Sequence, residues 1–172
     1  MQEPLIKDNK KTKIKTPHRI RSVSKNYSKD EWSGLDLSSH GLKYISMNLF
    51  NLYFLKELYL QKNELNFIPK EISELKNLEI LDISHNKLTN IPSEISKMIN
   101  LKILKLNDNF LSFIPMEIGT LYQLEIFNLE NNPLLDPFQQ IYQNKGGISV
   151  INFCRENMTN FPIPKERIWQ EN

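Results

Sequence analysis

Apolar residues recur along this chain with a constant spacing from Trp32 onward. The leading positions of successive units are 23 residues apart and are Trp32, Leu55, Leu78, Leu101 and Leu124. Each unit begins with an alternation of apolar and polar residues, as in Leu58-Tyr59-Leu60, which is the period-two pattern of a half-buried strand. Self-similarity with a period of about 20 to 50 residues predicts a stack of repeats rather than one globular core.

The repeating unit resembles a leucine-rich repeat. The full units read LKELYLQKNELNFIPKEISELKN, LEILDISHNKLTNIPSEISKMIN and LKILKLNDNFLSFIPMEIGTLYQ, preceded by WSGLDLSSHGLKYISMNLFNLYF and followed by the partial LEIFNLENNPLLDP. They share the pattern L-x-x-L-x-L-x-x-N-x-L-x-x-I-P-x-x-I-x-x-L. We therefore predict an α/β fold, a solenoid of about five repeats with short parallel strands on its concave face. One unit alone cannot offset its conformational entropy, so stacking has to stabilise the units.

The ninth position of each unit predicts an asparagine ladder inside the solenoid. It is occupied in successive units by His40, Asn63, Asn86, Asn109 and Asn132. An amide side chain can donate and accept at once, so it can satisfy backbone groups that the turn after each strand leaves unpaired. We expect His40 to make only part of this bonding and to leave a looser first turn.

Both ends of the repeat stack need capping segments, and we divide the flanking sequence on that basis. We predict a basic, disordered tail over 1–29, repeats over 30–135, a helical C-terminal cap over 136–160 and an extended exit linker over 161–172. Trp32, Leu35 and Leu37 are expected to close the first end. Within the cap, the apolar pattern predicts two short helices, 137–144 and 148–157, separated at Gly146-Gly147.

The concave face is the candidate binding surface. Neighbouring strands lie about 4.8 Å apart, so the third, fifth, seventh and eighth positions of the units form columns across it. The residues we expect to contact a partner come from the third and fifth columns: Tyr59, Ile80, Asp82, Ile103, Lys105, Ile126 and Asn128. Two interpretations of the three isoleucines stay open: an apolar centre for a partner, or aliphatic side chains that shield one another.

The sequence gives weaker support for catalytic residues or a metal site. Ser84 and His85 near Asp82 and Asp108 contain the residue types of a hydrolytic triad, but adjacent strand residues point in different directions and no oxyanion hole is evident. The single cysteine, Cys154, is expected to be a small buried hydrophobe. We predict no catalytic residue, metal site or cofactor.

Charge is distributed unevenly. Residues 1–29 carry nine Lys and Arg against two acids, whereas residues 30–172 carry 13 against 18. The basic tail is open to three interpretations: contact with nucleic-acid phosphate, a nuclear-import signal, or an ordinary disordered extension. We favour the extension, with weak nucleic-acid contact. No run approaches the roughly 20 apolar residues of a membrane span, so we expect a cytoplasmic or nuclear protein.

The C-terminal block carries a more specific resemblance. Asn132-Pro133-Leu134, the run from Ile151 to Asn157 and the run from Phe161 to Arg167 are similar to the leucine-rich-repeat region of the catalytic deadenylase of the carbon catabolite repression–NOT complex. The segment from Trp32 to Leu37, ahead of the repeats that follow, is similar to that family as well. The resemblance covers roughly Asp30 to Trp169.

This resemblance implies a docking role. In that family the repeats hold the second deadenylase subunit, an RNase-D-like nuclease, and precede a magnesium-dependent nuclease domain that removes poly(A) tails. None of that domain's catalytic residues has a matching position in this sequence, so we expect a non-catalytic protein-binding module. Two alternatives stay open: a generic scaffold for a small GTPase or phosphatase, and the N-terminal part of a poly(A)-specific 3'-5' exoribonuclease.

Overall fold

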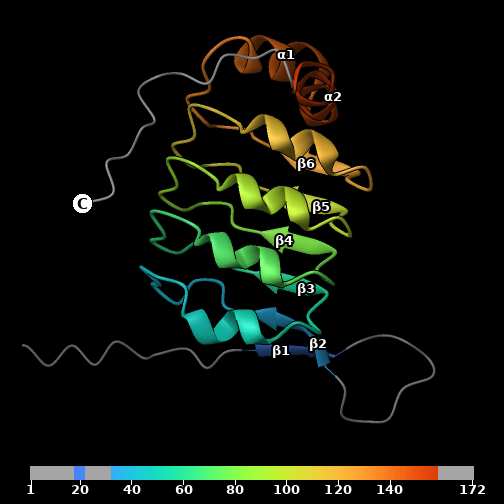
Figure 1. Ribbon diagram of the computed structural model, residues 1–172. Helices are drawn as coiled ribbons and strands as arrows, with labels where there is room; N and C mark the ends of the chain where they lie inside the picture. Colours follow the sequence, from blue (N-terminus) through green and yellow to red (C-terminus); the bar gives the residue numbers. More distant parts are fainter. Residues whose placement is uncertain (1–17, 22–31, 159–172) are drawn as a thin grey trace, which may run out of the picture.

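The computed structural model describes residues 18–21 and 32–158, and residues 32–158 form a stack of coils (Figure 1). Each coil contributes one short strand: β2 (Trp32–Asp36), β3 (Glu57–Tyr59), β4 (Ile80–Asp82), β5 (Ile103–Lys105) and β6 (Ile126–Asn128). These strands pair in chain order and in parallel, and every residue faces the one 23 positions further along. The predicted leucine-rich-repeat solenoid is therefore confirmed.

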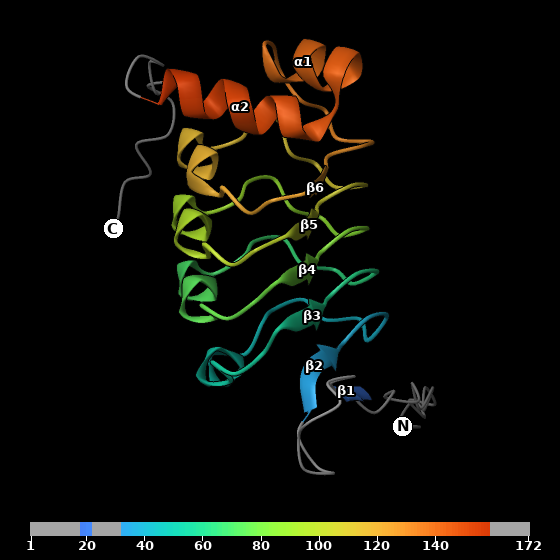
Figure 2. The same ribbon diagram turned by 90° about the vertical axis from the view of Figure 1, so that its right-hand side faces the viewer.

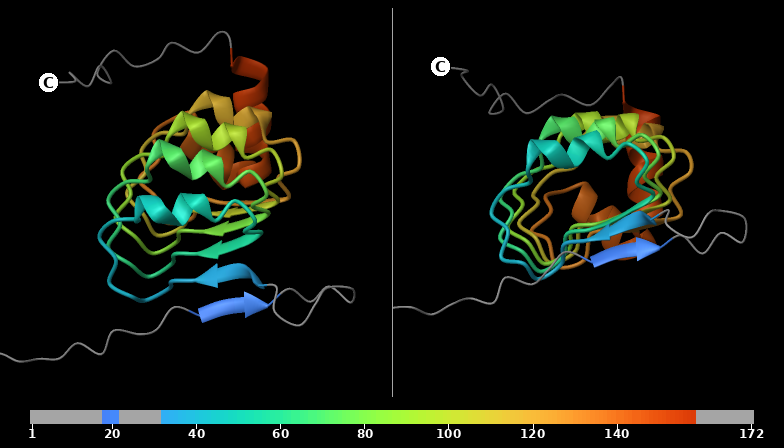
Figure 3. Two further views of the ribbon diagram at one scale, coloured as in Figure 1. Left: turned by 60° about the horizontal axis from the view of Figure 1, so that its bottom comes forward. Right: turned by 90° about the horizontal axis from the view of Figure 1, so that it is seen from below.

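Short 3-10 helices form the wall opposite the sheet, as Figures 2 and 3 show. They are η1 (Met47–Asn51), η2 (Lys70–Glu74), η3 (Ser93–Lys97) and η4 (Met116–Thr120). Pro69, Pro92 and Pro115 precede the last three with φ of −60°, −68° and −64°. The repeat pattern contains a proline at this position but did not predict that each one starts a helical turn. Proline suits such a start because its φ is fixed near −65° and its missing N–H has no helical partner there.

The core fills the space between the sheet and the 3-10 helices. Leucines and isoleucines from every coil are fully buried there, including Leu58, Leu81, Leu104, Ile72 and Ile95. Each interior coil packs on two neighbours, so the core is one continuous column.

Two helices cover the C-terminal end of the stack. They are α1 (Phe138–Lys145) and α2 (Gly147–Asn157), and Figure 2 shows them above β6. The predicted ranges differ by one residue: Gly146, with φ of 75°, makes the break, and Gly147 already belongs to α2. Val150, Ile151 and Cys154 of α2 are buried against the last repeat, as expected. The predicted exit linker lies outside the described residues.

The N-terminal end differs from the prediction. His18–Arg21 form strand β1, which pairs antiparallel with β2 inside the segment we expected to be a disordered tail. The physical reason is that β2 would otherwise present a row of unpaired backbone groups at the sheet edge. The remainder of 1–29 lies outside the described residues. Leu35 is buried beneath this end, and Trp32 and Leu37 are partly buried, as predicted.

Strands β3 to β6 are three residues long, so they contain only the third to fifth positions of each unit. The seventh and eighth positions belong to the following turn, which corrects their placement on a longer strand. The eighth residue of every unit has a left-handed backbone with φ between 53° and 58°: Ser39, Lys62, His85, Asp108 and Asn131.

Candidate protein-docking surface

The asparagine ladder lies directly behind the concave face and fixes its geometry. Asn86 is typical: its Oδ1 accepts the Leu65 N–H at 3.0 Å, and its Nδ2 donates to the carbonyls of Leu60 at 3.0 Å and Ile83 at 3.1 Å. Asn63, Asn109 and Asn132 repeat the arrangement. Each side chain therefore joins its own coil to the preceding coil, so the ladder also sets the distance between strands.

His40 satisfies less of the same bonding. Its backbone N–H donates to Asn63 Oδ1 at 3.0 Å, and its Nδ1 lies 2.7 Å from the Ser38 carbonyl oxygen. The other ring nitrogen, Nε2, is buried without a hydrogen-bond partner. The His40 side chain therefore makes fewer hydrogen bonds than the ladder asparagines do, whereas a looser first turn stays a prediction.

A second, shorter ladder lies on the limb that leads back to the strands. Asn77 Nδ2 donates to the Tyr53 carbonyl and Asn100 Nδ2 to the Lys76 carbonyl, both at 2.8 Å. Sequence reasoning missed it, although an Asn repeated at a spacing of 23 residues was the available signal.

The strand register brings the predicted site residues together in two columns. The third positions align as Gly34, Glu57, Ile80, Ile103 and Ile126, and the fifth positions as Asp36, Tyr59, Asp82, Lys105 and Asn128. Glu57 was not among the residues we selected for this site, although it continues the isoleucine column. Ile80 and Ile103 are half-buried and Ile126 is 47% exposed. A role for these residues in partner contact stays a prediction.

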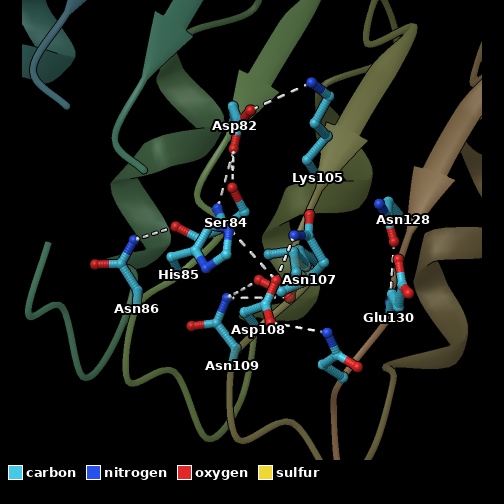
Figure 4. Close-up of polar contacts among 12 residues, drawn as sticks. Asp82, Ser84, His85, Asn86, Lys105, Asn107, Asp108, Asn109, Asn128 and Glu130 are labelled. Atoms are coloured by element: carbon cyan, nitrogen blue, oxygen red, sulfur yellow. Dashed lines mark hydrogen bonds and ion pairs between the residues drawn. The ribbon is translucent and has the colours of Figure 1, made fainter. Parts of the chain in front are cut away.

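Charge on the fifth column is largely paired within the protein. Asp82 is 6% exposed, accepts the Ser84 hydroxyl at 2.6 Å, and lies 3.4 Å from Lys105 Nζ (Figure 4). Asp82 and Lys105 face each other on β4 and β5, so this is a cross-strand ion pair. Asn128 accepts the Tyr142 hydroxyl at 2.9 Å, which connects the last strand to the capping helix α1.

Tyr59 lies among carboxylates. Its hydroxyl donates to Glu57 Oε2 at 3.0 Å. Burial, that hydrogen bond, and the charges of Glu57, Asp82 and Asp36 raise the pKa of Tyr59 to about 12. The phenol therefore stays protonated at neutral pH and serves as a donor on this face.

The Ser84–His85 pair does not form a catalytic arrangement. The Ser84 hydroxyl donates to Asp82, whereas His85 Nε2 lies 3.5 Å from Asp108 Oδ2 (Figure 4). Asp108 is also the acceptor for Asn107 at 2.7 Å and Asn131 at 2.9 Å, and these bonds, with the charge of His85, lower its pKa. A nucleophile and its base need a mutual hydrogen bond, and here each one contacts a different carboxylate.

The buried Cys154, the other residue considered for chemistry, lies in a structural position. Cys154 is fully buried, and burial, with the Glu117 charge, raises the pKa of its thiol to about 12, so it is no thiolate nucleophile. No cluster of His, Cys, Asp and Glu among the described residues could hold a metal ion. Nor does any helix within residues 18–21 and 32–158 have the length and apolar character needed to cross a lipid bilayer.

This fold and its polar concave face define a repeat protein, and comparison with known proteins agrees. Residues 35–141 match the family described as leucine-rich repeat region, and the chain belongs to that family. A leucine-rich-repeat protein of Leptospira interrogans has a similar structure, with a TM-score of 0.56, 34% identity, and coverage of 64% of this chain and 34% of that one. Internalin C2 of Listeria monocytogenes is also similar, with a TM-score of 0.54, 27% identity, and coverage of 59% and 43%.

Two curated relatives give a more specific match. Both are named probable CCR4-Not complex 3'-5'-exoribonuclease subunit Ccr4. The protein of Vairimorpha ceranae is 58% identical over 149 residues, or 87% of this chain, and that of Encephalitozoon cuniculi is 66% identical over 140 residues, or 81%. The chain spans 30% and 28% of these relatives. The resemblance to the deadenylase's repeat region is therefore confirmed.

Proposed function

We propose that this chain is the protein-docking repeat region of a Ccr4-type subunit and holds the second deadenylase subunit of a CCR4-Not complex on its concave face. The observation that carries this proposal is the identity of 58% and 66% to Ccr4 subunits over more than four-fifths of the chain. In that role it is a non-catalytic module that contributes binding.

The character of the concave face supports a protein partner. The apolar column Ile80, Ile103 and Ile126 has the polar fifth column beside it. Protein interfaces commonly consist of an apolar centre with a polar rim, and a few central residues supply most of the binding energy. The face is also held rigid by the asparagine ladder, so little conformational entropy has to be lost on binding.

A second candidate function follows from the names of the relatives. Both are exoribonuclease subunits, and this chain spans less than a third of each. The repeats would then be the N-terminal part of a magnesium-dependent poly(A)-specific exoribonuclease. Reading the genomic sequence downstream of the Asn172 codon tests this alternative, because a continuous reading frame into a nuclease domain would establish it. The docking role of the repeats is compatible with either outcome.

The docking proposal is tested with Ile103→Glu. This change places a charge at the centre of the apolar column, and we expect it to weaken capture of the second deadenylase subunit of the same organism at least about 30-fold. Isothermal titration calorimetry with the purified partner measures the loss, and circular dichroism with thermal melting checks the fold.

Ile99→Glu is the matched control. Ile99 is 60% exposed and lies in the turn between η3 and β5, away from the concave columns. The same substitution there should leave binding unchanged. If well-folded Ile103→Glu binds as tightly as wild type, the concave columns are not the binding site. If the wild-type chain does not bind the partner, the proposed function is wrong.

A further inference from the structure

The two ends of the concave face differ in chemistry. Towards the C-terminal repeats, its third column consists of Ile80, Ile103 and Ile126, whereas on β3 the same column holds Glu57. Across the third, fifth, seventh and eighth positions the repeats present two lysines against five acids. The lysines are Lys62 and Lys105, and the acids are Asp36, Glu57, Asp82, Asp108 and Glu130. The face as a whole is therefore apolar in its centre and negative around it.

Glu57 differs from Asp82 and from the nearby Glu79 in its surroundings. Asp82 is paired with Lys105, and Glu79, on the same coil as Asp82, lies 2.7 Å from Lys102 and 3.5 Å from Lys56. In the part of the chain that the structure describes, no cation pairs with Glu57, and its side-chain contact is the Tyr59 hydroxyl at 3.0 Å. Glu57 is half-buried and has carboxylates on both neighbouring strands, Asp36 and Asp82. Its negative charge is consequently uncompensated and partly shielded from solvent.

Tyr59 adds a feature that suits a cation. Its hydroxyl donates to Glu57 and remains protonated, so it orients the carboxylate without neutralising it. An aromatic ring beside an uncompensated carboxylate can bind an ammonium or guanidinium group through both charge and ring quadrupole.

We propose, on the basis of the proposed function, that the partner segment on the concave face carries a Lys or Arg side chain that pairs with Glu57 beside Tyr59. The same segment places an apolar side chain on Ile103 and Ile126. Glu57 and Ile103 are two strands apart, which corresponds to about 10 Å across the sheet. The two partner side chains are therefore separated by about seven residues in a helix. In an extended segment the separation is about two to four residues, and it has to be even for both side chains to lie on one face.

The experiment compares Glu57→Gln with Glu130→Gln. Both changes remove one carboxylate charge from the concave face, but exposed Glu130 lies in the turn after β6, at the other end of the sheet. We expect Glu57→Gln to weaken binding of the purified second deadenylase subunit about tenfold in 0.1 M salt, mostly through slower association. The difference should shrink in 0.5 M salt, because screening shortens the range of the interaction. Glu130→Gln should change affinity less than twofold.

A second measurement identifies the partner segment. Because Cys154 is buried, a thiol-reactive photocrosslinker attached to a Glu57→Cys variant labels the new site selectively. Mass spectrometry of the crosslinked complex should find Lys or Arg within two residues of the attachment point.

The outcomes separate the two proposals. Absence of wild-type binding contradicts the proposed function. Two results would contradict only the proposed pairing of a partner cation with Glu57. One is binding that Ile103→Glu weakens but Glu57→Gln leaves unchanged, and the other is a crosslinked segment without Lys or Arg. Tighter binding by Glu57→Gln would also overturn that pairing, because that result is expected if the chain's own basic N-terminal residues occupy this end of the face.

Discussion

At the scale of the residue, the ladder asparagines bond one coil to the next. Asn86 is 6% exposed and bonds to backbone groups of two successive coils. A buried backbone group without a partner costs free energy.

Asn86→Leu is therefore expected to lower the free energy of unfolding by about 1 to 3 kcal/mol. Leucine keeps the branching at Cγ but leaves the Leu65 N–H without its acceptor. Urea unfolding followed by circular dichroism measures the change. Asn66→Leu is the control, since Asn66 is exposed and its side chain makes no hydrogen bond with any described residue, and it should stay within about 0.5 kcal/mol of wild type. Equal stability of both variants would contradict the ladder's role.

The residue scale also shows where the sequence was informative and where it was not. The ladder could be predicted because one residue type recurs at a fixed spacing. The left-handed backbone at the eighth position could not, because the first two units have Ser39 and Lys62 there, which are not residues that favour it. His85, Asp108 and Asn131 do belong to the types enriched in that region. The conformation is imposed by the turn into the ladder, which is a tertiary requirement.

At the scale of the element, the capping helix α2 is held by close backbone contact. A Cβ built on Gly119 of η4 would lie 2.5 Å from the Arg155 backbone nitrogen. The equivalent positions of the two preceding units are Ser73 and Ser96. Arg155 completes the contact, since its Nε donates to the Gly119 carbonyl at 2.9 Å and its guanidinium lies 4.6 Å from the Tyr122 ring centroid.

Gly119→Ala is expected to push α2 away from the last repeat. The added methyl group meets backbone atoms, which cannot move aside, so we expect a loss of about 2 to 3 kcal/mol in unfolding free energy. Cys154, the single cysteine, lies on the buried face of α2, and its raised thiol pKa makes it unreactive in the wild type. Its alkylation by iodoacetamide under native conditions should accelerate at least about tenfold.

Ser96→Ala is the matched control at the same position of the preceding repeat. It removes a hydroxyl rather than adding a methyl group, and it should leave both stability and Cys154 alkylation near the wild-type values. Gly119→Ser introduces the serine that the two preceding repeats have at this position, and it should behave like Gly119→Ala. Normal alkylation in both Gly119 variants would show that α2 is not seated by this contact.

The two ends of the solenoid were predicted with unequal success for a physical reason. The helices α1 and α2 follow from a local apolar pattern and a glycine break, and both begin within one residue of the expected positions. Strand β1 has no such pattern in its four residues. It pairs because the edge of β2 is available, and that edge exists only after the repeats have stacked. Glu57 already stands beside Ile80 in the aligned repeats, but its contact with the Tyr59 hydroxyl, which no repeat pattern predicts, is seen only in the structure.

At the scale of the whole molecule, ion pairs join coil to coil. Four ion pairs found among the described residues connect positions 23 apart, namely Lys56–Glu79, Glu64–Lys87, Glu79–Lys102 and Asp82–Lys105, and the His85–Asp108 contact has the same spacing. Charges of opposite sign therefore alternate between neighbouring repeats. In a solenoid, stability is approximately a sum of repeat terms and interfaces between neighbours, so these pairs act on the interfaces.

Glu79 is the centre of this arrangement. Its carboxylate lies between Lys102 at 2.7 Å and Lys56 at 3.5 Å, so it joins three successive coils. The hydrogen bond and charge of Lys102, together with those of Lys56, lower the pKa of Glu79. A carboxyl group whose pKa is lower in the folded state contributes stability above its unfolded pKa, which is about 4.3 for glutamate. That contribution is lost as the pH falls through the folded-state pKa.

We therefore expect Glu79→Gln to reduce stability at pH 7 and to have progressively less effect below about pH 4.3. Urea unfolding of both proteins at pH 7, 5, 4 and 3.5 gives the difference at each pH. Glu74→Gln is the control, because exposed Glu74 forms no ion pair with any described residue, and its difference should stay near zero at every pH. In 0.5 M salt the Glu79 effect should shrink, since the carboxylate is partly exposed. A Glu79→Gln deficit that persists unchanged at pH 3.5 would mean that packing, not charge, connects these coils.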